Sequence, residues 1–96
     1  MENFEDEEEE ELLYRYDTQL LIERRDGKDL DDNAIRKYIG TKLVGDCLLV
    51  VGDEELVKIH FHTNEPWKVL EYCSTQGEIF DIVVEDMFRQ SAGKQG

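Results

Sequence analysis

Residues 56–63, with the sequence LVKIHFHT, decide the fold of this chain. Side chains on a strand alternate between two faces, so the apolar residues at 57, 59 and 61 point one way and His60 and His62 the other. The apolar side is expected to lie under helices. The two histidines are therefore expected on an open face of the sheet.

Three further strands are expected around this one. Apolar and polar residues alternate from Leu12 to Glu23, which predicts a first strand. Residues 47–51 form a second apolar run, joined to 56–63 by a Gly-Asp turn that predicts a β-hairpin. Residues 79–84 predict the fourth strand. Its expected inward-facing side chains are Phe80, Ile82 and Val84.

Two helices are expected between the strands. The first is predicted to be capped by Asp29 and to end at Gly40. Its expected buried side consists of Leu30, Ile35, Tyr38 and Ile39. The second is predicted to follow a cap at Asn64, with Pro66 in its first turn and Gly77 at its end. Its expected buried side consists of Trp67, Leu70 and Cys73.

The resulting order is β-α-β-β-α-β, which defines an α+β, ferredoxin-like fold. In this arrangement two helices cover one face of a four-stranded antiparallel sheet, and the first and third strands form its central pair. The expected domain occupies residues 12–90, and residues 91–96 are expected to be a flexible tail.

Charge is concentrated at the N-terminal end of the sequence. Eight of the 24 acidic residues fall within residues 1–11, a segment without a basic residue, which predicts an acidic, disordered linker. An interaction tail for a basic partner is the alternative. A net charge of −13 argues against binding to nucleic acid or to an anionic membrane surface.

The two cysteines, Cys47 and Cys73, are too few for a disulfide framework and are expected to be reduced core thiols. The sequence shows no signal peptide and no long apolar run, so we expect a cytoplasmic protein.

A metal site is the sharpest functional hypothesis. Two histidines on one side of a strand supply two ligands suited to zinc. Asp17 lies on the polar side of the first strand, beside the third, and is expected to be a third ligand. If Val51 pairs with Leu56, Cys47 falls opposite His60 and becomes a fourth candidate. An ordinary surface pair, or histidines at a domain interface, are the alternatives.

The sequence gives little support for a catalytic or nucleotide-binding site. No glycine-rich phosphate loop or nucleophile–base set is specified by spacing, so we expect no catalytic residue and no nucleotide site. Asp46 and Asp53 are interpreted as turn formers rather than as an acid–base pair. Trp67 is interpreted as a core residue, with a role as a surface anchor as the alternative.

A family resemblance rests on five segments. The chain resembles the middle domain of the bacterial fatty acid kinase A subunit, whose relatives are also described as dihydroxyacetone kinase-like or Dak phosphatase proteins. The resemblance covers about residues 12–90, and its most specific part runs from Val57 to Asn64. The segments are 14–19 (YRYDTQ), 45–53 (GDCLLVVGD), 57–64 (VKIHFHTN), 69–72 (VLEY) and 84–87 (VEDM).

The resemblance implies a larger parent protein with an N-terminal kinase domain that binds ATP and magnesium. It also implies a DegV-type fatty-acid-binding protein as partner, and a middle domain that contributes to dimerisation and holds a metal with a Cys-His-His set. His60 and His62 match the two histidines. Asp17 stands at the cysteine position, and a carboxylate is a harder ligand than a thiolate. Cys47 stands where serine is usual, and Trp67 where a small residue is usual.

Two functional hypotheses follow. The first is a non-catalytic, zinc-binding middle domain of a fatty acid kinase-like phosphotransferase, inactive as a kinase on its own. The second is an interaction module that dimerises or docks the DegV-type protein through its open sheet face. A free-standing metal hydrolase is disfavoured, because the sequence lacks a nucleophile or a two-metal ligand set.

Overall fold

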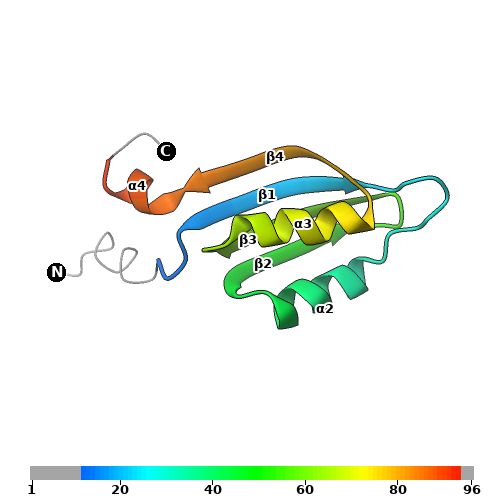
Figure 1. The fold of residues 1–96 in the computed structure, drawn as a ribbon, viewed down its shortest axis with the longest axis horizontal. Coiled ribbons are helices and arrows are strands. Elements are labelled where there is room, and N and C mark those ends of the chain that lie inside the picture. The colour runs from blue at the N-terminus through cyan, green and yellow to red at the C-terminus, as the bar shows by residue number, and fades with distance from the viewer. Residues whose placement is uncertain (1–11, 94–96) are drawn as a thin grey trace.

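A computed structural model of the protein describes residues 12–93 and confirms the ferredoxin-like fold (Figure 1). The strands are β1 (Tyr16–Glu23), β2 (Gly45–Gly52), β3 (Leu56–Thr63) and β4 (Glu78–Asp86). The helices are α2 (Asp32–Lys42), α3 (Pro66–Gln76) and the short α4 (Met87–Ser91). The strands pair antiparallel in the order β2-β3-β1-β4, so β1 and β3 form the predicted central pair.

The core lies between the sheet and the two longer helices, which lie on the same face of the sheet in Figure 1. The alternating apolar residues of β1 and β3 face these helices, as their spacing predicts. From α2 the core receives Ile35 and Ile39, and from α3 it receives Val69 and Cys73. The sheet contributes Leu20, Ile22, Val50, Val57, Ile59 and Phe61. The other face of the sheet carries neither helix.

The first helix begins and ends later than the sequence predicts. Its cap is Asp31, whose side chain accepts a hydrogen bond from the backbone N–H of Ala34, whereas Asp29 forms an ion pair with Arg24. The helix also continues through Gly40 to Lys42. Tyr38 was predicted to be buried, but it is partly exposed because its ring stacks on that of Tyr72 at the helix surface.

The second helix buries Cys73 as predicted and packs Leu70 partly against the core, but it leaves Trp67 outside. Its buried residues are Pro66, Val69 and Cys73, whereas Trp67 is 59% exposed, so the prediction of a core tryptophan is wrong. The helix starts at Pro66, and a rotation of about 100° per residue carries Trp67 away from the sheet. Asn64 does not cap this helix, because its Oδ1 accepts the backbone N–H of Arg15 instead.

β4 departs most from expectation. The predicted inward-facing residues Phe80, Ile82 and Val84 are all exposed. The strand lies at the edge of the sheet, and a bulge opposite residues 19–21 of β1 places Asp81 at φ 51°, so the alternation is interrupted. The sequence also did not predict α4. Asp86 caps this helix by accepting the backbone N–H of Arg89.

The acidic segment 1–11 and residues 94–96 of the expected tail lie outside the described residues. None of the helices formed by residues 12–93 has the length and apolar character that crossing a bilayer requires.

Candidate functional site

The open face of the sheet carries the predicted metal-binding residues side by side. His62 lies directly opposite Asp17 in the β1–β3 pair, and His60 lies opposite Gln19. Paired residues point to the same face, so both imidazoles and the carboxylate project from the face that α2 and α3 leave uncovered. The structure therefore brings together three of the four residues expected at the site.

The donor atoms of these residues are close enough to share one ion. The Nε2 atoms of His60 and His62 lie 3.0 Å apart. Asp17 Oδ1 lies 3.6 Å from His60 Nε2 and 3.8 Å from His62 Nε2. Two imidazole ligands on tetrahedral zinc, each about 2.05 Å from the metal, stand about 3.3 Å apart. The set fits a three-ligand zinc-type site that keeps one position open.

The three side chains are largely held in place. The exposed fractions are 28% for the His60 side chain, 20% for that of His62 and 16% for that of Asp17. The Gln19 side-chain amide lies 3.3 Å and 3.4 Å from the two carboxylate oxygens of Asp17 and orients the carboxylate. Such outer partners fix the direction of a metal ligand. We call Asp17, His60 and His62 the histidine site.

Cys47 does not lie where the sequence analysis placed it. Val51 pairs with Lys58 rather than with Leu56, and Leu49 is the residue opposite His60. A bulge in β2 between Asp46 and Leu49 shifts the register, and Cys47 within it has φ 56°. The left-handed conformation costs a non-glycine residue about 1–2 kcal/mol. Cys47 is exposed rather than a core thiol, whereas Cys73 is buried as predicted.

The bulge gives Cys47 a different set of neighbours. Its Sγ groups with a carboxylate oxygen of Asp46 and a ring nitrogen of His62, with all three donor atoms within 4.8 Å of one another. Partial burial, together with the charges of Asp46 and Asp17, raises the pKa of the Cys47 thiol. Sequence reasoning missed Asp46 as a site residue because its Gly-Asp context was interpreted as a turn. Its place opposite His62 follows only from the observed register.

Gly45 lets β2 approach the site closely. A Cβ at this position would collide with the backbone oxygen of His62 and the ring of Phe61. The missing side chain therefore allows Asp46 to lie beside His62.

Apolar side chains flank the site on the same face. Leu49 and Val83 lie at either end of the cross-strand row that contains His60 and Gln19. The next row carries Val51 and Phe80 at its ends. All four of these side chains are exposed. We call Leu49, Val51, Phe80 and Val83 the apolar rim.

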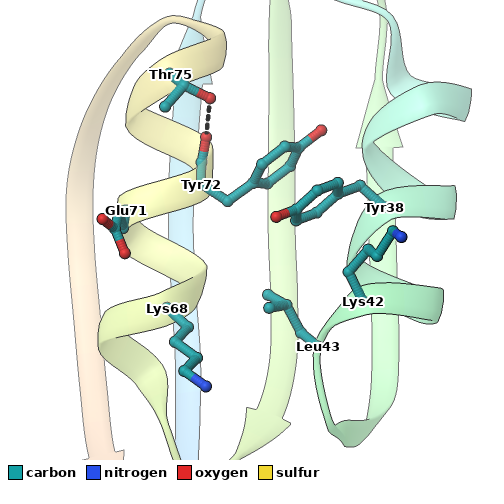
Figure 2. Close-up of a pocket in the computed structure, with 7 residues that line it drawn as sticks. All are labelled: Tyr38, Lys42, Leu43, Lys68, Glu71, Tyr72 and Thr75. Atoms are coloured by element: carbon teal, nitrogen blue, oxygen red, sulfur yellow. Dashed lines mark hydrogen bonds between the residues drawn. The ribbon is translucent and has the colours of Figure 1, made fainter.

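A groove of about 670 Å³ lies on the other side of the molecule, between α2 and α3 (Figure 2). The rings of Tyr38 and Tyr72 stack across it, nearly parallel, with centroids 3.8 Å apart. Leu43 lies below the rings, and Lys68, at the same end of the groove, is paired with Glu65 at 3.2 Å. The lining residues contain no histidine or cysteine. The metal-type donors gather on the opposite face of the sheet.

Fold and site together define an α+β domain with a candidate metal centre on its open sheet face. The chain belongs to the FakA-like family, the middle domain of proteins like the A subunit of fatty acid kinase, whose model matches residues 13–94. It is also similar to uncharacterized proteins of Staphylococcus aureus strains USA300, NCTC 8325 and N315. Each is 37% identical over 82 residues, which cover 84% of this chain. The match spans 15% of the length of each relative.

Proposed function

We propose that this chain is an accessory, zinc-binding middle domain of an ATP-dependent fatty acid kinase-like phosphotransferase. The observation that carries the proposal is the convergence of Asp17, His60 and His62 within 3.0–3.8 Å of one another. In this proposal, ATP and magnesium bind to another domain of the parent protein. We therefore expect no kinase activity from the 96-residue chain alone.

The donor set favours an ion of the zinc class. Two imidazoles and one carboxylate match the ligand types that zinc accepts, and three protein ligands leave a fourth position for water or a substrate oxygen. Such an ion supplies Lewis acidity at that position. The resemblance implies a cysteine at position 17, where this chain has aspartate. A carboxylate is a harder ligand than a thiolate, so we expect the site to select soft ions less strongly than a site with cysteine would.

The metal content of the untagged chain, purified without chelator, tests this proposal by elemental mass spectrometry. We expect close to one equivalent of zinc in the unmodified chain and none in the His60→Ala/His62→Ala variant. Glu71→Gln, on α3 and away from the site, is the matched control and should retain the metal. Chain that lacks zinc, and does not take it up when zinc is added back, would refute the proposal.

A second candidate function is an interaction module, and the apolar rim favours it. Exposed aliphatic and aromatic side chains around a polar centre are typical of a protein-binding surface. The occupants we propose are the DegV-type fatty-acid-binding protein or a second copy of the chain. On this hypothesis the histidines contact the partner rather than a metal.

Sedimentation of the chain, alone and with a DegV-type protein, tests the interaction module. The module predicts a complex that Val51→Asp/Val83→Asp disrupts and Trp67→Asp does not, since Trp67 lies on α3 and outside the apolar rim. A monomer that binds neither occupant at concentrations of tens of micromolar would exclude this second function.

A further inference from the structure

A second group of metal-type donors adjoins the histidine site. We propose that Asp46, Cys47 and His62 form a separate, thiolate-containing metal position, which we call the cysteine position, and that it competes with the histidine site for one ion. The inference rests on the proposed function, because the two positions share His62. The inference goes beyond the proposed function in two ways: it assigns a second, softer set of ligands, and it implies that the ion exchanges between the two positions.

The β-bulge builds the cysteine position. In a regular strand, consecutive side chains point to opposite faces, so Asp46 and Cys47 could not both reach His62. The bulge leaves residues 47 and 48 opposite a single residue of β3, and Cys47 takes a left-handed conformation at φ 56°. As a result, the donors of Asp46, Cys47 and His62 lie within 4.8 Å of one another. Bulges next to functional sites commonly re-aim a side chain in this way.

The ring of His62 lies between the two donor sets. Its Nε2 faces the histidine site, 3.0 Å from His60 Nε2 and 3.8 Å from Asp17 Oδ1. Its Nδ1 lies on the side of β2, 3.8 Å from Asp46 Oδ1. Each nitrogen of one imidazole is thus turned toward a different set of ligands.

A neutral imidazole offers one lone pair and one N–H, so it holds one ion at a time. An ion on Nε2 leaves the Nδ1 proton facing the Asp46 carboxylate, which is the carboxylate–histidine–metal arrangement found at many metal centres. An ion on Nδ1 leaves the Nε2 proton facing His60 and Asp17. In each case the vacant position therefore provides an acceptor for the proton on the other nitrogen.

The two positions differ in softness. The cysteine position combines one thiolate, one imidazole and one carboxylate, whereas the histidine site has two imidazoles and one carboxylate. Soft ligands select zinc-like and softer ions. On binding, the Cys47 thiol releases its proton to bulk water and coordinates as the thiolate. Zinc-class ions are expected to divide between the positions, and harder ions such as manganese to occupy the histidine site.

Cobalt(II) is a suitable spectroscopic substitute for zinc in the 96-residue chain, titrated under reducing conditions. Thiolate ligation gives an intense sulfur-to-cobalt charge-transfer band, whereas nitrogen and oxygen ligands give only weak ligand-field bands. We expect one cobalt per chain and a charge-transfer band. The Asp17→Ala/His60→Ala variant should keep this band, Cys47→Ser should lose it while still binding cobalt, and His62→Ala should lose it as well. Cys73 is present in every variant, and Glu71→Gln is the control for an unrelated carboxylate.

The cobalt titration distinguishes a failure of the cysteine position from a failure of the proposed function. Ligand-field bands without charge transfer in the unmodified chain would overturn the cysteine position and leave the proposed function intact. Loss of charge transfer in Asp17→Ala/His60→Ala would mean one shared site, and two bound ions would contradict competition. Cys47→Ser that no longer binds cobalt would refute the histidine site and not the cysteine position. Circular dichroism of each variant verifies that the fold is retained.

Discussion

Asp17 lies directly opposite His62 in the central β1–β3 pair of the sheet. This pairing sets a carboxylate beside the His-x-His pair without any contribution from a loop, because both residues belong to regular strands. Metal ligands on the rigid elements of a scaffold keep their geometry better than ligands on loops. A substitution that changes the ligand type at position 17 should therefore leave the backbone of the site unaltered.

Two buried threonines should respond in opposite ways to the same substitution. Thr18 Oγ1 is buried and has no hydrogen-bond partner among residues 12–93. Thr63 Oγ1 donates to the carbonyl oxygen of Val44 and accepts the backbone N–H of Glu65. Thr18→Val should raise the free energy of unfolding by about 1 kcal/mol, and Thr63→Val should lower it by about 1–2 kcal/mol. Urea unfolding measures both, and equal changes in the two variants would contradict this assignment.

Truncation to alanine at two nearby positions of α3 should lower the free energy of unfolding by very different amounts. Val69 is fully buried, whereas Trp67 is 59% exposed. Val69→Ala should destabilise the domain by about 2 kcal/mol, through lost apolar burial and the cavity left behind. Trp67→Ala should change stability by less than about 0.5 kcal/mol, as is usual for surface positions. A larger loss for Trp67→Ala, measured by thermal or urea unfolding, would show that the tryptophan packs into the core after all.

Asp86 should contribute to acid sensitivity. Its hydrogen bond and ion pair with Arg15 hold the pKa of this carboxyl below its usual range. A lowered pKa stabilises the fold at pH values above the unfolded-state value of about 3.9, and this contribution is lost as the pH falls through the folded-state value. Asp86→Asn keeps an oxygen to cap α4 but removes the charge. Between about pH 5 and pH 2 its stability should fall less steeply than that of the unmodified chain, and parallel curves would contradict this role.

The two thiols should differ in accessibility. Burial raises the pKa of Cys73 to about 12 and encloses its sulfur, whereas Cys47 is exposed on β2. A chromogenic disulfide reagent should therefore titrate one thiol in the native chain and two in the denatured chain. In Cys47→Ser the native count should fall to zero. Reaction of the remaining thiol at the rate of an unfolded peptide would show that the α3 side of the core opens readily.

Much of the fold follows from alternation in the sequence. The strand over residues 56–63 matches β3, because its apolar residues occupy every second position and both faces are unambiguous. The ferredoxin-like order then places the first strand beside it, and Asp17 near the histidines. These two steps were sufficient to identify the three residues of the histidine site.

The β-bulges explain most of what the sequence could not indicate. Cys47 and Asp81 adopt left-handed backbone conformations at φ 56° and 51°. Cysteine is not among the residues that usually mark this conformation, which are glycine, asparagine and aspartate, and a single aspartate within an apolar run does not by itself indicate a bulge. Each bulge shifts a register, which changes the neighbours of Cys47 in β2 and interrupts the alternation in β4. Phe80 and Val83 pair with Leu21 and Gln19 and therefore point to the open face, whereas Val84 pairs with the buried Thr18 and is exposed at the edge of the sheet. Trp67 was misplaced because the buried stripe of α3 follows the i, i+3, i+4, i+7 spacing of residues 66, 69, 70 and 73, and Trp67 lies about 100° around the helix from Pro66.

Thermal unfolding with and without zinc tests metal binding on the open face, the central claim, most directly. For zinc at about one hundred times its dissociation constant, linkage predicts a gain of about 2.7 kcal/mol. In a domain of this size that gain raises the midpoint by about 10–20 °C. We predict such a shift in the unmodified chain and its absence in His60→Gln/His62→Gln. An equal shift in both, or none in either, would contradict the account.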